Sequence, residues 1–116
     1  MPPRSGQPWM YGFLDLCLLS LLAERRDYGL GLAQRLADVG LGDVPGGTLY
    51  PALLRLESQG YVHATPEPSP SGPPRRYFAL TPAGSEAGAA LRRQWAGFRD
   101  GVDTVARAAG DRAASR

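Results

Sequence analysis

The side chains best suited to chemistry lie in two short stretches of the chain. The first stretch, residues 47–57, carries hydroxyl and guanidinium groups around a proline, at Thr48, Tyr50, Pro51 and Arg55. The second is the adjacent pair Arg75 and Arg76. Hydroxyl and guanidinium groups donate hydrogen bonds to phosphate oxygens and to base edges. These residue types therefore favour contact with a nucleic acid.

The first stretch is predicted to be a short amphipathic helix. Leu49, Leu53 and Leu56 recur at helical spacing and form one apolar stripe. The threonine, the proline and Arg55 fall away from that stripe, toward solvent. We place the proline in the first helical turn, where amides have no internal partner and its missing N–H is tolerable. Gly60 stands where a C-terminal glycine cap belongs.

Other elements must hold this helix and the arginine pair. Helices are predicted at about 12–24 and 29–39, a strand at 61–65, a proline-rich turn at 66–74 and a return strand at 76–80. Thr81 is the predicted cap of a last helix that runs from Pro82 to about Ala109. The expected fold class is mainly α with a small β-wing, a winged helix-turn-helix followed by a C-terminal dimerisation helix.

The last helix carries an apolar seam at alternating steps of four and three residues: Leu91, Trp95, Phe98, Val102 and Val105. One winged-helix domain contains nothing long enough to cover this seam, so the seam predicts a homodimer. We divide the chain into a flexible N-terminal arm (1–10), a DNA-binding winged helix-turn-helix (11–80), the dimerisation helix (81–110) and a flexible tail (111–116).

The net charge of +2 is mild, but its distribution is uneven. Residues 1–58 carry five arginines and six acidic residues, whereas residues 59–116 carry eight and five. The basic excess therefore lies in the wing and the last helix. Lysine, isoleucine and asparagine are absent, which is typical of a GC-rich bacterial genome. An arginine in this chain is for that reason a weaker sign of phosphate binding than usual.

Few residues are available for other chemistry. The single Cys17 excludes an internal disulfide, and the single His63 argues against a metal cage. We expect Cys17 to be a small core hydrophobe, with redox sensing as the alternative, and His63 to lie at the surface. The acidic residues are scattered, so neither an enzyme nor a bound cofactor is predicted. The apolar run at 16–23 is too short to span a membrane, which needs about 20 residues, and a cytoplasmic protein is expected.

Over roughly Leu14 to Val105 the chain resembles the PadR family of bacterial transcriptional regulators. The matching pieces are Tyr28-Gly29, Gly47-Thr48-Leu49-Tyr50-Pro51, Leu53-Leu54-Arg55-Leu56-Glu57, Gly60, Arg75-Arg76-Tyr77-Phe78 and Leu80-Thr81-Pro82-Ala83-Gly84. The Thr-Leu-Tyr-Pro run in register with the later Leu-Thr-x-x-Gly is specific. Gly46 departs from the family, which often has a polar or acidic residue there. The resemblance implies a homodimeric repressor of a palindromic operator.

The resemblance implies contacts with double-stranded DNA at Tyr28, Thr48, Tyr50, Pro51, Arg55, Arg75 and Arg76. Each contact has a structural alternative. The first tyrosine and the threonine could be helix caps, the second tyrosine could pack under the wing, and the proline could serve only to start the helix. Arg55 could pair with Glu24 or Glu57, and the arginine pair could be a solubilising turn.

The resemblance further implies an apolar space between the dimer helices for a small hydrophobic or aromatic effector. Trp95 would stack on the effector, with Leu14, Leu18 and Phe98 as walls. The alternative is that these side chains are ordinary interface packing. Two other functions stay open: a winged-helix module that binds protein instead of DNA, and a DNA-binding regulator without a ligand.

Overall fold

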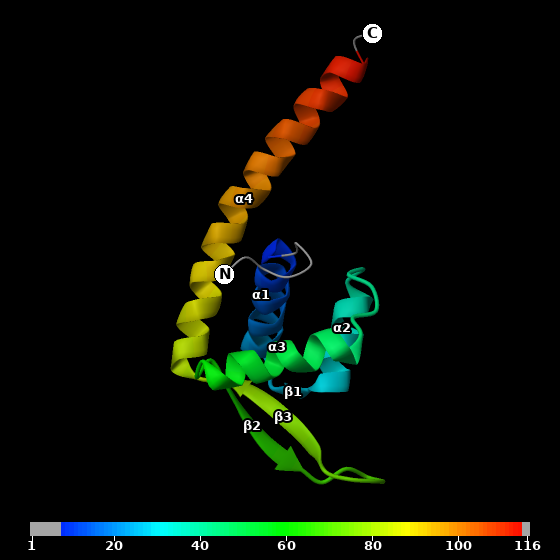
Figure 1. Cartoon of the computed structure of the whole chain (residues 1–116), viewed down its shortest axis with the longest axis vertical. Coiled ribbons are helices and arrows are strands. Elements are labelled where there is room, and N and C mark those ends of the chain that lie inside the picture. The colour runs from blue at the N-terminus through cyan, green and yellow to red at the C-terminus, as the bar shows by residue number, and fades with distance from the viewer. Residues whose placement is uncertain (1–7, 115–116) are drawn as a thin grey trace.

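The structure is a computed structural model that describes residues 8–114, with side chains from residue 12. In chain order the elements are α1 (Pro8–Glu24), β1 (Asp27–Tyr28), α2 (Gly29–Asp38), α3 (Gly46–Ser58), β2 (Val62–Glu67), β3 (Arg75–Leu80) and α4 (Pro82–Ala114). Figure 1 shows the three shorter helices gathered together, the β2–β3 hairpin projecting from them, and α4 extending beyond them. No helix within residues 8–114 is long and apolar enough to cross a membrane.

The three strands form one antiparallel sheet in the order β1-β3-β2. Tyr28 of β1 stands opposite Tyr77 of β3, and Ala64 of β2 stands opposite Phe78. The predicted fold class, mainly α with a small β-wing and a long C-terminal helix, is confirmed. We use the word wing for β2, β3 and the loop that joins them.

The core is formed mainly by leucines from the first three helices. The largest fully buried side chains are Leu18, Leu19, Leu32, Leu36, Leu49, Leu53 and Leu56. The predicted inward stripe of α3 is therefore confirmed. Burial of each leucine stabilises the fold by roughly 1.5–3 kcal/mol, and truncation of a fully buried leucine such as Leu53 to alanine should cost about 2–5 kcal/mol.

Two predicted caps fix the direction of the chain on either side of the wing. Gly60 adopts φ +80°. The amide of Tyr61 donates to the Leu56 carbonyl at 2.9 Å and that of Gly60 to Glu57 at 3.0 Å, the bond pattern of a Schellman motif. Thr81 caps α4, since its Oγ1 accepts a hydrogen bond from the Gly84 amide at 3.0 Å.

Gly84 is required by a close backbone contact. A Cβ at this position would overlap the carbonyl oxygen of Tyr61. The same carbonyl accepts the Thr81 amide at 3.1 Å. The spacing Leu-Thr-x-x-Gly thus joins a capping hydroxyl to the glycine that lets α4 begin against the end of α3.

Several helix bounds differ from those we expected. α3 starts at Gly46 with Pro45 at the N-cap position, and Pro45 makes no side-chain cap bond. Thr48 is therefore inside the first turn and is not a cap. Pro51 lies in the second turn, where its missing N–H forfeits a helical hydrogen bond, so its placement in the first turn was wrong.

Both ends of the chain carry more helix than the sequence indicated. α1 begins at Pro8, so residues 8–10 of the expected flexible arm are helical, and residues 1–7 lie outside the described part. α4 continues to Ala114, so residues 111–114 of the expected tail are helical, and residues 115–116 lie outside the described part.

Candidate nucleic-acid interface

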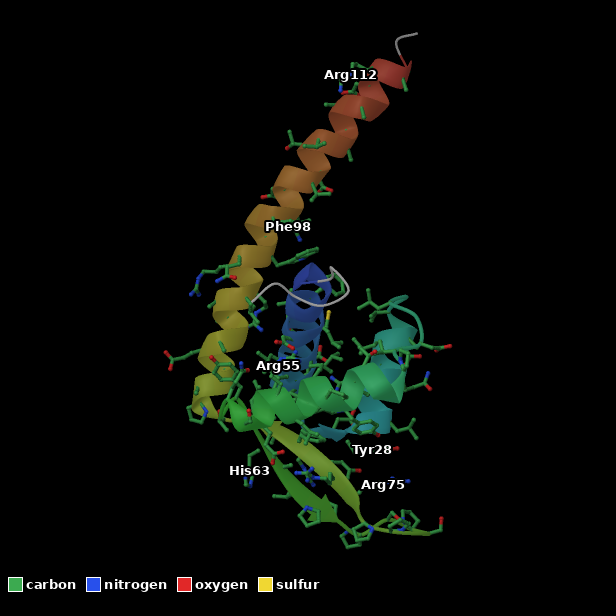
Figure 2. All side chains as sticks on the ribbon, viewed as in Figure 1. Tyr28, Arg55, His63, Arg75, Phe98 and Arg112 are labelled. Atoms are coloured by element: carbon green, nitrogen blue, oxygen red, sulfur yellow. The ribbon has the colours of Figure 1, made fainter. Side chains whose placement is uncertain are left out.

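A hollow of about 320 Å³ opens between the start of α2, the outer side of α3 and β3. Its lining consists of Tyr28, Gly29, Tyr50, Leu54, Pro74, Arg75, Arg76 and Phe78. Four of the residues that the sequence singled out for DNA contact are therefore gathered in one place: Tyr28, Tyr50, Arg75 and Arg76. Figure 2 shows Tyr28 and Arg75 side by side where α2 meets the wing.

Aromatic rings hold the wing arginine in this hollow. The guanidinium of Arg75 lies 4.5 Å from the ring centroid of Tyr28. The Tyr28 ring in turn lies 5.3 Å from that of Tyr77, its partner across the sheet, and Arg26 covers the Tyr77 ring at 4.9 Å. A cation–π contact at an exposed site is worth about 0.5–1 kcal/mol, enough to orient Arg75 without neutralising it.

Tyr28 is positioned by a charge pair that the sequence analysis missed. The carboxylate of Asp27 accepts hydrogen bonds from the Tyr28 amide at 2.9 Å and from Arg35 at 3.2 Å. Arg35 also donates to the Leu21 carbonyl at 3.0 Å. This network ties β1 to the end of α1 and to α2. Tyr28 occupies the N-cap position of α2 in an extended conformation, as the cap alternative expected, but its side chain makes no cap hydrogen bond.

Arg76 is paired, but only at the surface. It donates to the carboxylate of Glu57 on α3 at 3.2 Å, and its side chain is 54% exposed. Exposed ion pairs contribute about 0–1 kcal/mol. A phosphate group could therefore compete for the Arg76 guanidinium at little cost.

Arg55 does not line the hollow, and its side chain is only partly exposed, so its contact with DNA stays a prediction. Its guanidinium binds the carboxylate of Asp15 on α1, with the two side chains 36% and 19% exposed. The partners considered from the sequence, Glu24 and Glu57, instead contact Arg35 and Arg76. Burial raises the pKa of the Asp15 carboxyl, and the charge and hydrogen bond of Arg55 act in the opposite direction.

Thr48 is also separated from the hollow. It lines a second space, of about 290 Å³, at the junction of the first three helices, beside Leu14, Cys17 and Val44. Its contact with DNA stays a prediction from the family resemblance. Pro51 and Leu54 are both exposed on the outer side of α3. The sequence analysis did not single out Leu54, although its position one turn after Tyr50 indicated the same outward face.

The predicted seam of α4 is largely uncovered in the single chain. Phe98, Val102 and Val105 are 58%, 50% and 72% exposed. Leu91 packs partly buried against the core, and the Trp95 ring meets Phe13 edge-on at 5.4 Å. In Figure 2 Phe98 projects from α4 above the body of the molecule.

A hollow of about 450 Å³ lies beside Trp95, with walls that differ from those expected. Phe13 and Leu16 of α1 line it together with Leu91, Gln94, Trp95 and Phe98 of α4 and Gly12. Leu18 is fully buried and Leu14 nearly so, and neither lines this space. Their assignment as walls was wrong, because the leucines surround α1 and the sequence does not show which side meets α4.

The single histidine and the single cysteine of the chain lie where we expected them. His63 is exposed on β2. Cys17 packs partly buried against the core, and burial raises the pKa of its thiol. A raised pKa lowers the thiolate fraction and so disfavours the alternative of redox sensing.

The comparisons with known proteins agree with this geometry. A family model for the transcriptional regulator PadR-like family matches residues 18–90. A comparison with curated proteins gives no match. A Streptococcus transcriptional regulator is 32% identical with a TM-score of 0.74, and the match covers 85% of this chain and 97% of that one. A PadR family regulator of Eggerthella lenta is 36% identical with a TM-score of 0.71, and the match covers 81% of each chain. A PadR-like regulator of Bacillus cereus is 28% identical with a TM-score of 0.72, and the match covers 83% of this chain and 93% of that one. The match over most of the chain shows that this protein belongs to the PadR-like family of transcriptional regulators.

Proposed function

We propose that this protein is a DNA-binding repressor that acts as a homodimer on a palindromic operator in the bacterial cytoplasm. The observation that carries the proposal is the convergence of Tyr28, Tyr50, Arg75 and Arg76 on one hollow between α3 and the wing. In this arrangement α3 enters the major groove and the wing follows the neighbouring backbone or minor groove.

The charges of the hollow support contact with phosphate. Among the described residues no carboxylate pairs with Arg75, whose guanidinium lies over a ring. The pair between Arg76 and Glu57 is exposed and easily exchanged. Two cations at the edge of a helix that fits the major groove would release condensed counterions from DNA and supply affinity that depends on salt.

The uncovered seam of α4 supports the homodimer. Phe98, Val102 and Val105 leave a continuous apolar strip in water, with Gly97 and Gly101 beside it. A second copy of the same helix would bury this strip and place two copies of α3 about one helical turn of DNA, roughly 34 Å, apart. The operator would then share the two-fold symmetry of the protein.

The hollow beside Trp95 supports a flat hydrophobic effector that releases the DNA. One chain forms only an open half of this space, between α1 and α4, and the second protomer would close it. An effector can weaken DNA binding only if it favours an arrangement of the two α4 helices in which the distance between the two copies of α3 does not match the operator. The alternative is a regulator whose occupancy of DNA depends on its abundance alone.

The proposal is tested with the promoter DNA of the protein's own gene. Fluorescence polarisation should show tight binding to this duplex and weaker binding to a shuffled duplex of equal length. Equal and negligible binding to both would favour the rival function, a winged-helix module that binds protein. Binding that no flat aromatic compound weakens would favour the regulator without a ligand.

A further inference from the structure

The outward face of α3 has an unusual composition for a helix that enters the major groove. Its exposed residues are Gly46, Gly47, Tyr50, Pro51, Leu54 and Ser58, and none is charged. The two charged side chains of α3 are only partly exposed, and each is engaged in an ion pair: Arg55 with Asp15 on α1, and Glu57 with Arg76 on the wing. The exposed residues of α3 therefore include no arginine, lysine, asparagine or glutamine, the residues that most often recognise guanine and adenine.

Leu54 is the largest aliphatic side chain on this face, and it is 52% exposed. It lines the same hollow as Arg75 and Arg76, so the surface that would attract a polyanion includes an uncovered leucine. Pro51 lies three residues earlier on the helix and is exposed beside it. The two side chains form an apolar patch flanked by cations.

The major groove contains one apolar group that can cover such a patch, the C5 methyl of thymine. We infer that Leu54, together with Pro51, recognises thymine methyl groups and so determines operator sequence. This inference rests on the proposed function, because it requires α3 to enter the major groove. It predicts that the protein distinguishes its operator from other DNA at A·T pairs that lie opposite these two residues in each half-site.

The experiment begins with selection of duplexes from a random pool by the full-length protein. In a selected duplex each thymine is then replaced in turn by deoxyuridine, which lacks only the methyl group. We expect one or two positions per half-site at which this replacement weakens binding about fourfold, the equivalent of about 0.8 kcal/mol for one buried carbon. Leu54→Ala should bind less tightly and should no longer distinguish thymine from deoxyuridine at one of these positions.

Val39→Ala is the matched control. Val39 is 69% exposed at the end of α2 and does not line the hollow, so this variant should keep the full sensitivity to deoxyuridine. Thermal unfolding should show that Leu54→Ala remains folded, since the side chain is half-exposed. Wild-type protein that ignores every deoxyuridine replacement, or Leu54→Ala with undiminished sensitivity, would overturn the inference while leaving DNA binding intact. Failure to select any sequence would instead contradict the proposed function, and the inference with it.

Discussion

The ring of Tyr50 lies directly against the backbone of Gly29, so closely that a Cβ at position 29 would overlap the ring and its hydroxyl. This contact joins α3 to the first residue of α2, next to the strand that carries Tyr28. It explains in physical terms why a tyrosine-glycine pair and the later Thr-Leu-Tyr-Pro run occur in the same chain. The glycine provides the space in which α3 packs against the start of α2.

We therefore expect Gly29→Ala to destabilise the protein by about 1–3 kcal/mol, as overpacking usually does. The added methyl group must displace the Tyr50 ring and with it the wall of the hollow. Urea unfolding of the two single variants and of Gly29→Ala/Tyr50→Ala measures the coupling between these residues. The double variant should be destabilised by less than the sum of the two single variants.

Gly47→Ala provides the control for the intrinsic effect of an added methyl group. A Cβ at Gly47 meets nothing within 4 Å. In a helix this change should stabilise by about 0.5–1 kcal/mol. Two glycine variants with the same effect would show that the contact with Tyr50 has no energetic importance.

The seam of α4 predicts the behaviour of a second pair of variants. Phe98→Glu/Val102→Glu places two charges on the exposed strip and should yield monomers, because burial of an unpaired carboxylate costs several kcal/mol. Light scattering measures the mass. Arg93→Glu, an exposed position on the same helix, should remain dimeric. A well-folded dimer of the double variant would disprove the seam as the interface.

Some features could be predicted from the sequence because their causes are local. Gly60, Thr81 and the stripe of α3 follow from helix spacing and from capping, which involve neighbours a few residues apart. The core leucines of α3 were correct for the same reason.

Other features depend on distant residues and could not be predicted. β1 has only two residues, too few to show an alternating pattern, and it forms only because β3 passes beside it. The partner of Arg55 lies 40 positions away on α1. The sides of α1 could not be assigned from the sequence, since leucines surround the helix; this is why Leu14 and Leu18 were misplaced and Phe13 was overlooked.

Arg75→Ala should weaken binding to operator and to random DNA alike. A phosphate contact carries no sequence information, and its loss should lower the slope of log K against log salt by roughly one unit. Fluorescence polarisation over a series of salt concentrations measures this slope. Loss of affinity for the operator alone would show that Arg75 recognises bases.

Two arginine variants separate this effect from net charge. Arg93→Ala removes the same charge from an exposed position on α4, outside the hollow, and should leave the slope nearly unchanged. Arg55→Ala should also leave it unchanged, because Arg55 is held against Asp15. A slope reduced by one unit in Arg55→Ala would show that Arg55 does contact phosphate, as the sequence suggested.

The hollow beside Trp95 predicts quenching of its fluorescence by flat aromatic compounds. The chain contains two tryptophans, so the measurement should use a Trp9→Phe background in which Trp95 alone reports. Compounds that quench should lower operator affinity in parallel, with matching concentration dependence. Leu16→Phe, which adds bulk to the α1 side of the hollow without adding a second tryptophan, should abolish the quenching. Quenching without any change in operator affinity would separate the pocket from regulation.

The pair between Asp15 and Arg55 predicts how stability depends on pH. Burial raises the pKa of Asp15 in the folded state despite Arg55. The folded state therefore binds this proton more tightly than the unfolded chain does. The resulting stability is complete below the ordinary aspartate pKa of about 3.9 and declines as pH rises through the raised value.

Asp15→Asn removes this titration but keeps an acceptor for Arg55. Its free energy of unfolding, compared with wild type by urea titration, should gain on that of wild type between about pH 4 and the raised pKa of Asp15, and the difference should stay constant at higher pH. Arg55→Met should cost about 1–2 kcal/mol at pH 7, where the half-buried carboxylate loses its partner, and less at pH 4, where that carboxylate can be protonated. Parallel curves for wild type and Asp15→Asn across this range would mean that Asp15 titrates as it does in water, and that burial on α1 does not affect its charge.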